Sequence, residues 1–331
     1  MIKYIIKRVL WMIPITLGVL FIVFTITHLT PGDPVVSMLG TNYTQEQYDM
    51  KEAELGLDKP FMVQFVNYVE GVVTEFDLGT SYQTNRAVRD ELFDRFPTTI
   101  SLGLIGTIIT ILLGIPFGII SATKQYSALD YGVTTVALFF ASMPNFWMAL
   151  MMIILFSLNL KLFPATGLES WKGWVLPCLA LGLSPVATVT RMTRSSMLDV
   201  VRQDYIRTAR AKGLSEGTII KKHALKNAMI PIITVVGMQM STIVAGSVII
   251  ENIFAIPGIG SLLMSAINNK NYPVIQGGVL LLSLSVCVMN LLVDILYAFV
   301  DPSIRAQYAS GSKKKKTASV QQDKEAAANE G

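Results

Sequence analysis

Six long apolar segments divide the chain, and polar stretches of very different length separate them. A helix needs about 20 residues to cross the roughly 30 Å hydrocarbon core of a bilayer, and each segment approaches or exceeds that length. Pro144 and Asn145 interrupt the third segment, and the fourth contains two prolines. The pattern predicts an all-α polytopic membrane protein with six transmembrane helices, over residues 9–29, 98–122, 131–160, 174–190, 229–250 and 277–300.

The longest polar stretch, residues 31–97, is expected to form a helical cap on the outer side of the membrane. It holds twelve acidic residues against five basic ones, and loops that are poor in Lys and Arg mostly lie outside. Thr44 and Gln47 have the spacing of a capping box, and Gly56 suits the end of the helix that follows.

Two more helices are expected before the second span. Pro60 fits the first turn of one of them, because its missing N–H is not needed there. Val88, Leu92 and Phe96 line one face of the other. We place the boundary between the cap and the membrane core, residues 98–305, directly after this third helix.

The second long polar stretch, residues 191–231, is expected to be an inner loop built as two helices around a corner. Its nine basic residues against three acidic ones place it on the cytosolic side. Gly213 suits a left-handed residue after a helix, and Ser215 suits the N-cap of a second helix that runs towards Pro231. Residues upstream recur at three- and four-residue spacing and predict one amphipathic helix: Leu198, Val201, Tyr205 and Thr208 or Ala209.

The distribution of positive charge sets the expected orientation. Across the expected loops and termini, 19 Lys and Arg residues fall on one side and 8 on the other. Positive residues favour the inner side, so both termini should face the cytosol. Residues 1–30 then form a cytosolic N-terminus and an uncleaved first span, since no small-x-small cleavage pattern follows it. Residues 306–331 are expected to be a disordered basic tail, whose Lys313 to Lys316 are either solvated or touch anionic lipid.

The last span carries two polar residues, Asn290 and Asp294. Polar groups are costly at membrane depth and usually face a bundle interior or a cavity. One interpretation makes Asp294 a ligand for a substrate or an ion. The other, which we favour, pairs it with a neighbouring helix near the cytosolic interface.

Composition excludes an ordinary soluble domain, because 52% of the residues are hydrophobic, 15% are charged and the mean hydropathy is +0.51. Cys178 and Cys287 lie far apart in apolar runs and suit small buried hydrophobes. The sequence has no Gly-Lys dipeptide and therefore no P-loop, and no catalytic or metal-binding motif. We expect a chain that is not an enzyme, holds no cofactor or metal, binds no nucleic acid, and relies on separate subunits for any ATP it uses.

Several motifs resemble one family, the permease subunits of binding-protein-dependent ABC importers. In the inner loop, Arg207-Thr-Ala209 followed by Gly213 is similar to the Glu-Ala-Ala…Gly pattern of that family, with Arg207 and Thr208 replacing Glu and Ala. This form is typical of the B-type subunit of the dipeptide, oligopeptide and nickel branch. Further segments resemble the same branch: residues 30–34, 76–81, 95–99, 251–260 and 290–305. The last of these has Ser303 where the branch usually has Arg.

The resemblance implies a type I ABC importer permease fold in the cell membrane and a set of partners. These are a second homologous permease, two cytosolic ABC ATPases, an extracytoplasmic solute-binding protein and membrane lipid. It implies that an external turn borders the gate, formed by Pro257, Gly258 and Gly260. It also implies that the inner loop couples to an ATPase, through Tyr205, Arg207, Thr208, Ala209, Arg210, Lys212, Gly213, Leu214 and Ser215.

Three functions therefore compete. The expected one is the channel-forming subunit of an ATP-driven importer of dipeptides or oligopeptides, working by alternating access. A permease for nickel or another small solute is the first alternative. An ion-driven secondary transporter or a membrane scaffold is less favoured, because the sequence shows neither inverted repeats nor charges at midmembrane depth.

Overall fold

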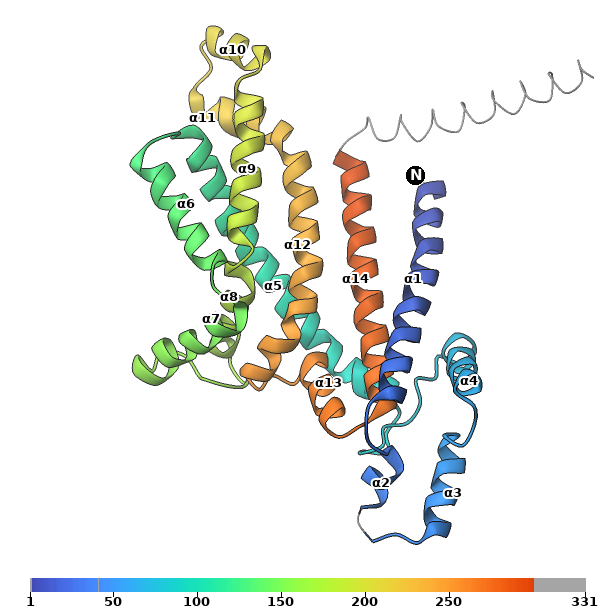
Figure 1. Ribbon diagram of the computed structural model, residues 1–331. Helices are drawn as coiled ribbons and strands as arrows, with labels where there is room; N and C mark the ends of the chain where they lie inside the picture. Colours follow the sequence, from blue (N-terminus) through green and yellow to red (C-terminus); the bar gives the residue numbers. More distant parts are fainter. Residues whose placement is uncertain (1, 41, 301–331) are drawn as a thin grey trace, which may run out of the picture.

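The computed structural model describes residues 2–40 and 42–300, so Ser303 and the expected tail, 306–331, lie outside the described residues. The described part is helical, and its strand-like pairing is limited to one isolated bridge between Thr80 and Ala87. Long helices run side by side between two ends of the molecule (Figure 1). One end carries the corner of the polar loop, and the other carries a group of short helices.

Four helices are long and apolar enough to cross a membrane, and two bent pairs extend the number of spans to six if each pair counts as one. The long helices are α1 (Ile2–Leu29), α5 (Val88–Thr123), α12 (Leu225–Ile253) with the turns that precede it, and α14 (Tyr272–Val300). One bent pair is α8 (Trp171–Leu183) with α9 (Val186–Val201), joined at 50°. The fourth expected span thus continues well into the expected loop as one bent element.

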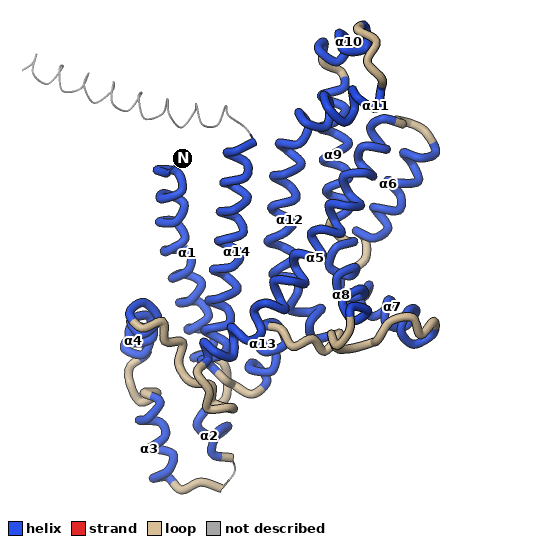
Figure 2. Tube along the Cα trace, turned by 180° about the vertical axis from the view of Figure 1, so that it is seen from behind, coloured by secondary structure: helices blue, strands red, loops and turns tan. Residues whose placement is uncertain are grey.

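The other bent pair departs further from the expected straight span at 131–160. Helix α6 (Ala128–Ala141) ends before Pro144, and α7 (Asn145–Met152) with the π-helical η1 (Ile153–Asn159) turns away by 99°. Proline lacks the N–H that would continue the helix, which explains the break. Fourteen residues of α6 span about 21 Å, less than the hydrocarbon core, so this element is a short span followed by a segment lying across the end of the bundle (Figure 2).

The expected cap contains α2 (Pro34–Leu39), α3 (Gln45–Leu55) and α4 (Phe61–Thr74). The capping box at the start of α3 is confirmed, since Thr44 N donates to Gln47 Oε1 at 3.0 Å and Gln47 N donates to Thr44 Oγ1 at 3.3 Å. Gly56 ends α3 in the left-handed conformation, as expected. Pro60 precedes α4 as its N-cap residue.

Helix α5 crosses residue 97, where we placed the boundary between the cap and the membrane core. The helix expected around Val88, Leu92 and Phe96 does not end before the second span, because α5 runs unbroken through Pro97 to Thr123. Val88 and Leu92 before the proline and Thr99 and Leu102 after it are all fully buried, so packing continues across the proline. The cap and the membrane core therefore share one helix.

Helix α5 lies at the centre of the bundle and approaches α9 closely. A Cβ built at Gly118 would lie 2.3 Å from Thr193 Cβ, and one at Gly114 would lie 2.8 Å from Val189 Cβ. These two glycines, four positions apart on α5, let the two backbones come together, as small residues do at contacts between membrane helices. Helices α12 and α14 complete this core, and α1 packs beside α14 (Figure 2).

Candidate functional site

The corner of the polar loop consists of two short helices that meet at Gly213. Helix α9 ends at Val201, Gln203 is extended, and α10 (Asp204–Ala211) follows. The expected single helix from Leu198 to Ala209 is therefore wrong, because the chain breaks at Arg202 and Gln203. Gly213 has φ 75°, a conformation that other residues adopt only with strain.

The second helix begins as the sequence indicates. Ser215 Oγ accepts a hydrogen bond from Thr218 N at 3.4 Å and caps α11 (Glu216–Thr218). The helix then continues through the π-helical η2 (Ile219–Ala224) into α12, so it passes Pro231 rather than ending there. The corner is thus attached rigidly to one of the long helices.

A small core fixes this corner to α9 and α12. Ile206 and Ile219 are fully buried, one on each side of Gly213, and they belong to a cluster with Met197 of α9 and Ile232 of α12. Because the corner packs on both long helices, a displacement of the corner moves their ends as well.

Two polar contacts add to this attachment. Asn227 Nδ2 donates to the Tyr205 hydroxyl at 2.9 Å. Arg210 Nε donates to Glu216 Oε1 at 2.7 Å and so bridges the two helices across Gly213. Arg210 is therefore already paired inside the corner.

The residues expected to couple to an ATPase are mostly presented to the outside. Tyr205 and Leu214 are 43% and 41% exposed, which is high for large apolar side chains. Ala209 departs from the expectation, since it is buried inside the corner and offers no surface to a partner. The remaining members are all exposed: Arg207, Thr208, Arg210, Lys212, Gly213 and Ser215.

At the opposite end, the turn between α12 and α13 (Ile259–Asn268) contains the expected gate residues. Pro257 is exposed, whereas Gly258 and Gly260 are buried. A Cβ at Gly258 would lie 2.3 Å from the carboxyl group of Glu251, and one at Gly260 would lie 2.3 Å from Val248 Cα. Both positions therefore require glycine for close approach.

Glu251 holds this turn in place, a role that the sequence did not indicate although the residue begins the 251–260 motif. Its side chain is fully buried, and Oε2 accepts hydrogen bonds from Gly260 N at 2.7 Å and Ser261 N at 3.2 Å. Oε1 accepts from Thr99 Oγ1 at 2.8 Å and Ser247 Oγ at 3.2 Å. The signal available in the sequence was an acidic residue at the end of an apolar span, seven residues before a glycine.

The two polar residues of the last span make contacts between helices. Ser241 Oγ of α12 donates to Asn290 Oδ1 at 2.9 Å. Arg8 of α1 lies 3.1 Å from Asp294 Oδ2, so the structure pairs Asp294 with a neighbouring helix. These contacts join α14 to α12 on one side and to α1 on the other.

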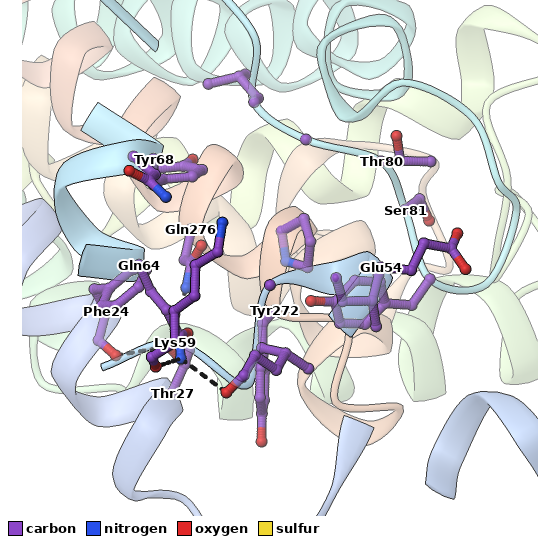
Figure 3. Close-up of a pocket in the computed structure, with 18 of the residues that line it drawn as sticks. Phe24, Thr27, Glu54, Lys59, Gln64, Tyr68, Thr80, Ser81, Tyr272 and Gln276 are labelled. Atoms are coloured by element: carbon purple, nitrogen blue, oxygen red, sulfur yellow. Dashed lines mark hydrogen bonds between the residues drawn. The ribbon is translucent and has the colours of Figure 1, made fainter. Parts of the chain in front are cut away.

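The cap encloses a hollow of about 580 Å³ between α1, α3, α4 and the start of α14. Figure 3 shows Tyr68, Gln276 and Thr27 around it, with Lys59 and Glu54 also at its wall. The Tyr68 hydroxyl is buried and has no hydrogen-bond partner in the part of the chain that the structure describes.

The tyrosines of this hollow remain hydrogen-bond donors at neutral pH. Burial raises the pKa of Tyr82, another wall residue, to about 12. Burial also raises the pKa of Tyr68 above its usual range. Within residues 2–40 and 42–300, no group of three His, Cys, Asp or Glu side chains is placed to hold a metal ion.

Two family models together match nearly the whole chain. Residues 114–306 match the binding-protein-dependent transport system inner membrane component. Residues 1–103 match the N-terminal part of such membrane components. The chain belongs to this family. It is thus a multi-pass permease of the inner membrane, and the resemblance found in the sequence is confirmed.

Known relatives of this permease match along its length. The dipeptide transport system permease protein DppB of Alkalihalophilus pseudofirmus is 41% identical, covering 92% of this chain and 100% of the relative. The protein of the same name from Escherichia coli is 39% identical, covering 92% and 99%. Among solved structures, the permease resembles a chain of the MetNI methionine ABC transporter in an inward-facing conformation, with a TM-score of 0.56 and 18% identity. That match covers 63% of this chain and 96% of the other, and it supports the type I importer fold.

Proposed function

We propose that this permease forms half of the membrane channel of an ATP-driven importer of dipeptides or oligopeptides. The observation that carries the proposal is the corner around Gly213, a rigid and exposed pair of helices packed on two long helices. The names of the relatives support a peptide rather than nickel as substrate. A second, homologous permease forms the other half of the channel.

Energy for transport comes from two ATPase subunits that bind the corner. Tyr205 and Leu214 supply apolar contact area, and Arg207 and Lys212 pair with acidic side chains at the edge of a groove. Closure of the ATPase pair on ATP pulls the corner, and α9 and α12 tilt the bundle from inward- to outward-facing. Such coupling requires nucleotide states that differ in their contacts with the corner.

On the outer side, the cap meets a solute-binding protein that delivers the peptide. The hollow lined by Tyr68 and Gln276 lies beneath that cap, and the exposed outer surface of the cap meets the docked protein. This arrangement needs the termini and the corner on the cytosolic side and the cap outside. The excess of Lys and Arg at the corner end supports that orientation.

The test compares Gly213→Val with Gly217→Val in the reconstituted importer. A Cβ added at either position would have no atom within 4 Å, but only Gly213 has a positive φ. A left-handed residue with a Cβ costs roughly 1–2 kcal/mol, so the first variant distorts the corner. We expect peptide-stimulated ATP hydrolysis to fall severalfold for Gly213→Val only. Unchanged stimulation in a correctly assembled Gly213→Val complex would refute the coupling role.

A further inference from the structure

A second cavity, of about 650 Å³, opens where the turn between α5 and α6 meets the junction of α9 and α10. Its described lining contains no acidic residue. Four of its lining residues are cationic: Lys124, Arg202, Arg207 and Arg210. The cavity borders the buried core of the corner, because Ala122, Leu198 and Val201 belong to both, and its wall also includes the α5–α6 turn.

The positive charge of this cavity is only partly neutralised. In the described part of the chain, no ion pair includes Lys124 or Arg202. Arg207 lies 3.8 Å from the almost fully exposed Asp204, which is a weak pair, and Arg210 pairs with Glu216. The cavity is therefore suited to an anion.

The acid nearest in sequence to Lys124 does not serve the cavity. Asp130 is buried, and its carboxylate accepts hydrogen bonds from Ser121, from Tyr126 N at 3.0 Å and from Arg194 at 3.1 Å. The negative charge of Asp130 is thus compensated by groups between α5, α6 and α9. It does not neutralise the positive charges of Lys124 and Arg202.

The floor of the cavity is apolar. Ala122 is buried, and Leu198 and Val201 are half-buried on the adjoining helix. The hydroxyl groups of the wall point away from an anion, since Thr123 Oγ1 donates to a carbonyl of α5 and Ser127 Oγ donates to Lys124 O. A ligand with a charged end and an apolar body fits such a surface better than a small ion does.

The surroundings of the cavity are exposed and largely apolar. Helix α6 lies at the outer edge of the bundle in both views (Figures 1 and 2) and carries exposed apolar residues such as Leu129 and Phe139. Tyr126, in the turn itself, is 74% exposed, and Tyr131 on the first turn of α6 is also exposed. Exposed tyrosines at the end of a lipid-facing helix mark the level of the headgroups.

We propose that this cavity binds the phosphate-bearing headgroup of an anionic phospholipid. Lys124 and Arg202 bind the phosphate, Leu198 and Val201 contact the glycerol region, and the acyl chains lie along the exposed face of α6. Basic pockets between membrane helices bind anionic headgroups in this manner. An acidic patch of a protein partner is less suitable, because the apolar surface continues from the cavity down α6.

The experiment titrates the full-length permease in detergent with dioleoylphosphatidylglycerol and counts bound lipids by native mass spectrometry. The test variant combines Lys124→Gln with Arg202→Gln. Its control combines Lys161→Gln with Lys172→Gln, which removes the same charge from the opposite end of the bundle. Each positive residue near anionic lipid contributes ~1 kcal/mol and the test variant loses two of them, so we expect roughly thirtyfold weaker binding. Dioleoylphosphatidylcholine should bind all three proteins equally.

Three results would overturn the proposal. The first is equal phosphatidylglycerol affinity in the test and control variants. The second is displacement of the lipid by inorganic phosphate at equal concentration, which would identify a site for the free ion. The third is that the test variant loses a copurifying subunit but still binds the lipid normally, which would assign the cavity to a protein interface. The charge-conserving pair Lys124→Arg with Arg202→Lys should bind normally and shows that loss of charge, not misfolding, is measured.

Discussion

At the scale of single residues, the most consequential side chain is a buried carboxyl group at the start of the 251–260 motif, whose role the sequence did not indicate. Glu251 accepts four hydrogen bonds, two from hydroxyl groups and two from the backbone at the start of α13. A buried polar group without such partners costs free energy, so these bonds are what make its burial tolerable. Glu251 therefore determines where the Pro257–Gly260 turn lies.

Replacing Glu251 by Gln should lower the stability of the permease. The amide nitrogen of Gln is a donor, so it would either face the N–H groups of Gly260 and Ser261 or deprive the Thr99 hydroxyl of the acceptor for its proton. An unsatisfied buried donor costs about 1–3 kcal/mol. We expect a lower transition temperature for the purified permease in detergent. The exposed Glu169→Gln should leave it unchanged, and equal transition temperatures for both variants would contradict this role.

The sequence shows why some of these residues were predictable and others were not. Gly258 and Gly260 stand out because glycines clustered after a proline indicate a tight turn. The hydrogen bond between Thr99 and Glu251 joins residues 152 positions apart, and local spacing carries no information about such a contact. The pairing of Arg8 with Asp294 spans 286 positions, so only the existence of some partner could be expected.

At the scale of elements, the sequence predicted the helix caps correctly, but it did not show which prolines break a helix. Thr44, Gly56 and Ser215 cap or end helices as expected, because each acts on backbone groups within a few residues. Pro97 lies inside α5, whereas Pro144 coincides with a 99° bend. Neighbouring helices decide whether a membrane helix tolerates a proline, and the local sequence does not contain those neighbours.

The contact between α5 and α9 is sensitive to side-chain volume. In Gly118→Val, the new Cβ would meet Thr193 Cβ at 2.3 Å and Thr190 O at 2.7 Å. Overpacking of this kind costs about 1–3 kcal/mol, and the backbone oxygen cannot move aside easily. We expect a lower transition temperature and less assembled protein. Gly132→Val on α6, where nothing lies within 4 Å, is the matched control and should behave like the native protein.

Helix α1 packs against α14, and the ion pair between Arg8 and Asp294 tests how much that contact contributes to stability. Arg8 is half exposed, so the pair with Asp294 should stabilise the contact by only about 0.2–1 kcal/mol. Arg8→Asp and Asp294→Arg alone each place like charges together and should lower the transition temperature. The double variant should recover most of the loss. If the double variant is as unstable as the sum of the single ones, the two side chains do not interact.

At the scale of the whole molecule, the two ends of the bundle differ in chemistry. One end carries the cationic corner and the cavity lined by Lys124 and Arg202, and the other carries the acidic cap. The N-terminal end of α1 and the end of α14 lie at the same end as the corner (Figure 1). The family and the helical architecture were predictable from motifs and apolar runs. The position of the α7–η1 segment was not, because α6 and α7–η1 together have the length and composition of one membrane span.

The orientation of this asymmetric bundle can be measured directly. In a background with Cys178→Ala and Cys287→Ala, the variants Lys212→Cys and Asp58→Cys place one thiol on the exposed corner and one on the exposed cap. Loops rich in Lys and Arg stay on the cytosolic side, so a membrane-impermeant maleimide should label only the Asp58→Cys variant in spheroplasts. In inside-out vesicles it should label only the Lys212→Cys variant. The reverse pattern would place the corner outside, where no ATPase could reach it, and would remove the basis of the proposed coupling.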